Sequence, residues 1–209
     1  MSVSRLCLPT IVLLAGACAG DPAAMDGLGS GDPTAAESAL RFLRPAGSAP
    51  PLAERSVSFW AVRGQRREVR LMYRPAQGQP DSVEFARFRV DDRSLVNDVS
   101  GQPIPMGDSI RITLTVADTL RLITEFEPSG LRFNPARPAR LWLKFGEADP
   151  DLDGDGLVTA ADTTLLLGMS IWRQEAGAND WTWLPSSIDT STQEVEADIA
   201  GFTRFAVSY

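Results

Sequence analysis

Apolar and polar residues alternate along most of the chain beyond residue 56. The clearest cases are residues 57–61, 110–116 and 195–199, where every second residue is apolar. Successive side chains of a β-strand point to opposite faces of its sheet, so this period of two predicts strands with one buried and one solvated face. Further strands are expected at residues 69–73, 83–90, 120–126, 131–133, 139–145, 171–172, 181–183 and 205–209.

Turn residues separate these segments at the spacing that is typical of a sandwich. We therefore expect an all-β fold, an antiparallel β-sandwich over residues 55–209. Within residues 83–90 the apolar phase changes: Val83 and Phe85 share one phase, and Phe88 and Val90 share the other. One extra residue in a strand produces such a shift, so a β-bulge is expected near Ala86.

The first residues have the pattern of an export signal. Arg5 is followed by an uncharged apolar stretch, residues 6–17, and by small residues around Cys18. This stretch is too short to cross a bilayer, which needs roughly 20 apolar residues, and it matches the layout of a signal peptide over residues 1–18. Residues 19–54 are rich in glycine and proline, so we expect a flexible tether there.

The run Leu-Leu-Ala-Gly-Ala-Cys that ends at Cys18 resembles a bacterial lipobox. That resemblance implies a lipid on Cys18 and a lipoprotein anchored to the cell envelope, at the outer membrane or the cell surface. A second reading remains open, in which ordinary signal peptidase cuts after Ala19 and leaves a periplasmic or secreted protein.

Residues 151–162 read Asp-Leu-Asp-Gly-Asp-Gly-Leu-Val-Thr-Ala-Ala-Asp and resemble the twelve-residue calcium loop of an EF-hand. Positions 1, 3, 5, 7, 9 and 12 of such a loop face the ion. The expected metal ligands are Asp151, Asp153, Asp155, the backbone carbonyl of Leu157, Thr159 through a water, and a bidentate Asp162. Four carboxylates without a neighbouring cation repel one another, and bound calcium would remove that conflict.

A short helix is expected after the loop, over residues 160–167 with Gly168 at its end, and Val158 is expected to face the core. The loop followed by Leu165-Leu-Leu resembles one repeat of a dockerin, a module that pairs with a partner domain. A dockerin has two such repeats and this chain has one. We therefore expect a short insertion in the sandwich that calcium holds in place. The alternative is a calcium-dependent, dockerin-like module that recognises a polysaccharide or an enzyme complex.

Residues 130–143, with residues 181–189 and 195–207, resemble the ZU-five domain. The resemblance implies a β-sandwich used for protein contacts. Some members of that family cleave themselves at His-Phe-Ser, and the matching positions here are Gly201, Phe202 and Thr203. The histidine is missing, and a hydroxyl without a base is a poor nucleophile. Self-processing is therefore kept only as an alternative function.

Composition narrows the function further. The chain has no histidine, and its two cysteines, Cys7 and Cys18, lie in the signal region. Histidine-dependent catalysis and histidine- or thiolate-bound metal sites are thereby excluded from the sandwich. A net charge of −7 argues against nucleic-acid binding. We expect a non-enzymatic protein with an unknown protein or polysaccharide partner. Trp172, Trp181 and Trp183 are expected to pack in the core, with a platform for stacking sugar rings as the alternative.

Overall fold

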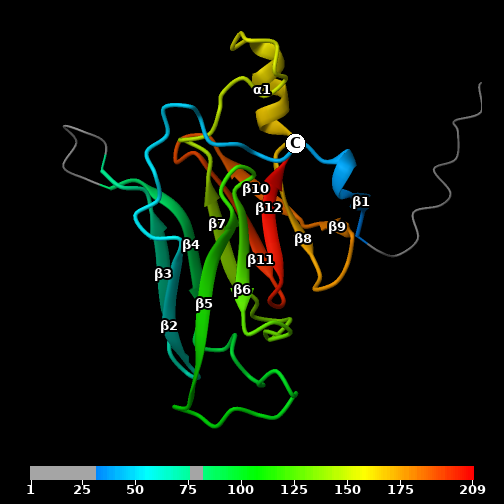
Figure 1. Ribbon diagram of the computed structural model, residues 1–209. Helices are drawn as coiled ribbons and strands as arrows, with labels where there is room; N and C mark the ends of the chain where they lie inside the picture. Colours follow the sequence, from blue (N-terminus) through cyan, green and yellow to red (C-terminus); the bar gives the residue numbers. More distant parts are fainter. Residues whose placement is uncertain (1–31, 76–81) are drawn as a thin grey trace, which may run out of the picture. The chain divides into compact units, whose positions relative to one another are not determined.

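Two antiparallel β-sheets packed face to face form the protein, which confirms the predicted all-β sandwich. The computed structural model describes residues 32–75 and 82–209 (Figure 1). The predicted signal peptide, Cys18 and the first part of the predicted tether, residues 19–31, lie outside the described residues.

Within the described residues, the larger sheet has seven strands in the order β1-β9-β8-β12-β6-β5-β2. Its members in chain order are β1 (Thr34–Ala36), β2 (Ser56–Val62), β5 (Ser109–Asp118), β6 (Ile123–Glu127), β8 (Ser170–Gln174), β9 (Asp180–Trp183) and β12 (Arg204–Ser208).

The smaller sheet, in the same described part of the chain, has five strands in the order β10-β11-β7-β4-β3. They are β3 (Arg67–Met72), β4 (Glu84–Val90), β7 (Ala139–Lys144), β10 (Ser186–Asp189) and β11 (Glu194–Ile199). A 3-10 turn, η1 (Glu37–Ala39), and one helix, α1 (Ala160–Leu167), complete the described elements.

The core lies between the sheets and follows from the alternation in sequence. On β5 the side chains of Ile112, Leu114 and Val116 are buried, while the residues between them face outward. Aromatic rings join the two sheets at the centre: Phe88 of β4 lies 4.9 Å from Phe126 of β6, measured between ring centroids. Burial of these apolar rows is the main favourable term that holds the sheets together.

The predicted β-bulge is confirmed in β4. The register to β3 pairs Leu71 with Ala86 and then Met72 with Glu84, so Phe85 has no partner of its own. Phe85 and Ala86 are consequently both buried, although they are neighbours in sequence. The extra residue explains the change of apolar phase along this strand.

Two strand predictions near the middle of the chain are wrong. Leu120 is not part of a strand: β6 begins at Ile123, and the carboxylate of Asp118 accepts hydrogen bonds from the amides of Leu120 and Arg121, which closes a turn. Residues 131–133 form single bridges, Phe133 with Leu95 and Arg132 with Gly201, and no strand. Strands β1 and β10 were not expected, because each is too short to show a period.

The prediction of a flexible tether over residues 19–54 is wrong for its described part, residues 32–54. β1 pairs with β9, the amide of Leu43 donates to the carbonyl of Val207 at 3.0 Å, and Leu52 bridges to Tyr73. Phe42 is buried beside Trp181, with ring centroids 5.0 Å apart, and Leu43 joins the main core. The glycines and prolines prevent a regular element here, but two adjacent apolar side chains anchor the segment.

If residues 32–54 belong to the fold, Leu43→Ala should lower the free energy of unfolding by about 2–5 kcal/mol, because it empties a fully buried site. The side chain of Leu43 is 1% exposed. Leu120→Ala is the matched control, since Leu120 is 74% exposed, and it should change the free energy by about 0.5 kcal/mol or less. Urea unfolding curves measure both. Equal unfolding midpoints for the two variants would show that residues 32–54 do not stabilise the fold, as expected of a flexible tether.

Candidate metal centre

The acidic loop lies between β7 and α1, at the end of the sandwich where the chain also finishes (Figure 1). The predicted helix is confirmed, with the bounds Ala160–Leu167. Gly168 ends it, donating its amide to the carbonyl of Leu165 at 2.9 Å. The phenol of Tyr209 donates to the carbonyl of Leu152 at 3.0 Å, so the last residue ties the loop to the end of β12.

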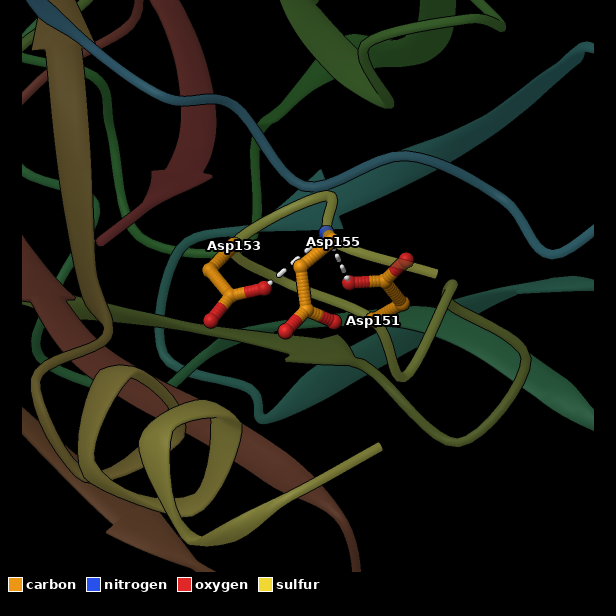
Figure 2. Close-up of side chains that lie close together, drawn as sticks. All are labelled: Asp151, Asp153 and Asp155. Carbon is orange, nitrogen blue, oxygen red and sulfur yellow. Dashed lines mark hydrogen bonds between the residues drawn. The ribbon is translucent and has the colours of Figure 1, made fainter. Parts of the chain in front are cut away.

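Three of the predicted metal ligands come together. Asp151, Asp153 and Asp155 each offer a carboxylate oxygen, and these oxygens all lie within 4.8 Å of one another (Figure 2). The three side chains are exposed or half-buried, so an ion could reach them from solvent. Oxygen atoms grouped in this way suit a hard cation such as calcium.

Backbone amides hold the three carboxylates in place. Asp151 accepts hydrogen bonds from the amides of Gly154 at 2.8 Å, Asp155 at 3.1 Å and Gly156 at 2.8 Å. Asp153 accepts from the amide of Asp155, as Figure 2 shows. Gly154 and Gly156 have φ angles of +80° and +87°, a region that side chains disfavour. The two glycines therefore let the chain wrap its amides around Asp151.

Asp162, the expected bidentate ligand, lies apart from these three carboxylates. It is 3% exposed, and its carboxylate accepts from the amides of Leu152 at 2.7 Å, Asp153 at 3.2 Å and Thr159 at 2.7 Å. The amide of Thr159, followed by those of Asp153 and Leu152, lowers the pKa of Asp162 below its usual value of 3.8. In this structure the hydrogen bonds of Asp162 connect the start of the loop to the first turn of the helix. Its role as a metal ligand stays a prediction.

The remaining predicted positions have separate local roles. Thr159 is the N-cap of α1: its hydroxyl accepts from the amide of Ala161 at 3.1 Å and forms a capping box with Asp162. Such caps are typically worth about 1 kcal/mol. The side chain of Leu157 points to solvent, as the use of its backbone carbonyl would allow. Val158 was expected in the core, but it is 66% exposed, because the loop stands out from the sandwich.

A cavity of about 680 Å³ opens beside the loop. Asp151 and Asp153 line it together with Arg41, Arg44 and Tyr209. Burial raises the pKa of the Tyr209 phenol above its usual value. An ion held by the acidic residues would border this open space, from which water could complete its coordination.

The hydroxyl considered for self-processing is not placed for catalysis. Thr203 is buried, and its hydroxyl donates to the carbonyl of Gln174. The chain contains no histidine that could take its proton. A buried hydroxyl that is committed to a structural hydrogen bond is a poor nucleophile.

Only one of the three tryptophans that were predicted to pack in the core is fully buried. Trp181 is fully buried, and its indole nitrogen donates to Glu37 at 3.3 Å, whereas Trp172 and Trp183 are half-buried. Trp60 on β2 is the tryptophan that faces solvent among the described residues. The exposure of Trp60 could have been predicted from the alternation in residues 57–61. Val57, Phe59 and Ala61 point inward, so Trp60 lies on the opposite face.

Comparison with protein-family models, with curated proteins and with solved structures gives no match for this chain. Its function is therefore argued from its own residues.

No helix within residues 32–75 and 82–209 has the length and apolar character needed to cross a membrane.

Proposed function

We propose that this protein is an exported bacterial lipoprotein whose β-sandwich carries a calcium-binding loop and serves in contacts at the cell envelope or surface. One observation carries the proposal: the carboxylate oxygens of Asp151, Asp153 and Asp155 lie within 4.8 Å of one another in a loop shaped by amide hydrogen bonds.

The donor set favours calcium over other metals. Calcium takes about six to eight oxygen ligands at roughly 2.3–2.6 Å and tolerates irregular geometry, whereas magnesium demands a near-ideal octahedron. Three carboxylates, the carbonyl of Leu157 and water supply such a set, with Thr159 acting through a water. Asp162 would join only by giving up the amides of Leu152 and Thr159, which it binds in this structure.

The envelope location rests on the first residues of the chain. An uncharged apolar stretch and a lipobox-like run precede Cys18. A diacylglycerol-type anchor on Cys18 would hold the mature protein at a membrane, because several acyl chains bind far more firmly than one. The sandwich would then be displayed at the envelope, at the outer membrane or the cell surface.

The residue types available support a non-enzymatic role. The chain lacks histidine, and Lys144, its single lysine, forms an ion pair with Glu194 at 2.6 Å. The ZU-five-like pattern supports a sandwich that makes protein contacts. Recognition through the loop itself is the second candidate function, and the apolar side chains of Leu157, Val158 and Leu167, exposed around the loop and α1, favour it.

Calcium binding can be measured by calorimetric titration of the metal-free protein. A single loop of this kind should bind with a dissociation constant on the order of 10⁻⁴–10⁻³ M. Calcium at ten times that constant would stabilise the fold by about 1.4 kcal/mol. Asp155→Ala should weaken binding sharply because it removes a direct ligand. Asp92→Ala, an exposed carboxylate outside the loop, is the control and should bind as wild type does. Identical heats of calcium binding for wild type and Asp155→Ala would contradict the proposed site.

Membrane attachment can be tested with Cys18→Ser. This variant should lose its lipid and move from the membrane fraction to the soluble fraction, because the serine hydroxyl cannot replace the thiol, whose sulfur forms the bond to the glyceryl group of the lipid. Cell fractionation with intact-mass measurement reports both changes. A wild-type protein that is already soluble and cut after Ala19 would contradict the lipoprotein assignment.

A further inference from the structure

One part of the outer face of the larger sheet is polar, beside the second apolar cluster, to which Ile123 and Ala206 belong. In the polar part, Arg204 of β12 lies between Gln174 of β8 and Glu125 of β6. On the next strands Glu127 pairs with Thr113, which pairs with Ser58 of β2. Because successive side chains alternate between faces, these residues point away from the core.

This face is hollowed. One cavity of about 450 Å³ is lined by Gln174, Glu125 and Arg204, among others. A second, of about 660 Å³, is lined by Ser58, Arg111 and Thr113. The second is shallow and wide open to solvent. Glu127 and Ser129 line both, so the two hollows adjoin, and together they are called the groove. The groove spans five neighbouring strands, from β8 to β2, which corresponds to about 19 Å at the usual strand spacing.

Gln174 lies at one end of this groove. Its residue is 8% exposed and lines the cavity. The oxygen and nitrogen of its side-chain amide are not among the buried polar atoms that lack a partner, so they are open to the groove. A ligand hydroxyl, which both donates and accepts, would satisfy this amide.

Trp60 stands at the other end of the groove. It pairs across the strands with Arg111, which lines the second cavity, and it is 60% exposed. Within the described part of the chain, no aromatic ring or guanidinium packs against its indole ring. An exposed indole face offers a large, rigid apolar surface on which the C–H face of a sugar ring can stack.

The acidic and basic side chains on this face balance one another, which favours an uncharged ligand. Glu125 and Glu127 are balanced by Arg111 and Arg204, and Glu125 lies 3.5 Å from Arg204 in an ion pair. Of the two carboxylates at the rim, Glu37 pairs with Arg121 and Glu175 with Arg173. A charged polymer would therefore gain little from the groove, whereas a chain of hydroxyl groups would find both donors and acceptors.

We propose that this groove binds a neutral polysaccharide, with Trp60 as the stacking platform and Gln174, Glu127 and Arg111 as hydrogen-bonding partners. The site goes beyond the calcium loop: Trp60 and the three hydrogen-bonding residues do not belong to the loop, although Glu37 lines both the groove and the cavity beside the loop. The loop touches Tyr209, after the end of β12, whereas Arg204 begins that strand. Five residues of extended strand separate the two by about 16 Å.

Affinity electrophoresis tests the proposal with the full chain purified in detergent. Native gels would contain soluble neutral polysaccharides (hydroxyethylcellulose, arabinoxylan, galactomannan or mixed-linkage glucan), with polygalacturonate gels and a poly-lysine competitor as the charged probes. We expect at least one neutral polymer to retard the wild-type protein, and about a tenfold or greater loss of affinity in Trp60→Ala, because a central aromatic anchor is removed. Gln174→Ala should weaken binding as well.

Leu120→Ala, which removes an exposed apolar side chain in the turn between β5 and β6, is the matched control and should be retarded as wild type is. Melting temperatures should agree between Trp60→Ala and wild type, because the ring is largely in solvent. A chelator should leave the retardation unchanged. Failure of every neutral polymer, retardation by polygalacturonate alone, competition by poly-lysine, full binding by Trp60→Ala, or loss of binding with chelator would each overturn the proposal. The last outcome would place the ligand at the calcium loop, while calorimetry of calcium binding tests that loop independently.

Discussion

The alternation of side chains along antiparallel strands is the constraint on which this structure depends. It places apolar rows between the sheets, where Phe88 and Phe126 meet, and it sends every intervening residue to an outer face. The outer face of the larger sheet consequently carries polar residues in register across five strands, from Gln174 through Arg204, Glu125 and Thr115 to Ser56. A packed core and a polar groove are thus two results of the same period.

Local hydrogen bonds, and not apolar packing, hold the acidic loop in its conformation. Like charges that would repel one another are held side by side because backbone amides face Asp151 on one side of the loop and Asp162 on the other. Asp162 joins the start of the loop to the first turn of α1, and Tyr209 joins the loop to the last strand. Both oxygens of Asp151 accept amide hydrogen bonds, whereas Asp153 and Asp155 each accept through one oxygen only, so the hydrogen bonds of the chain itself fix the positions of the three carboxylates.

Periodic and local features were predictable from sequence, and features that depend on distant partners were not. The longer strands, the bulge at Phe85 and the helix that ends before Gly168 each have a signal within a few residues, whereas the short strands β1 and β10 have none. Residues 32–54 lack such a signal. Phe42 and Leu43 stabilise the fold only through contacts with residues far away in the sequence: Phe42 packs with Trp181, and Leu43 packs in the main core. Likewise, a pattern places Asp162 at a ligand position but does not say that three backbone amides compete for its carboxylate. The groove depends on cross-strand register, which no single segment encodes.

The central claim is that the loop holds calcium through Asp151, Asp153 and Asp155. The most direct measurement is a titration of ¹⁵N-labelled protein with calcium, followed through the amide resonances by NMR. The account predicts saturable shifts of Gly154, Asp155, Gly156 and Leu157, whose amides bind these carboxylates, while the strand amides stay unchanged. If Asp162 becomes a ligand, the amides of Leu152 and Thr159 should shift with them. Loop resonances that do not move with calcium, or that drift without saturation alongside those of exposed carboxylates elsewhere, would contradict the claim.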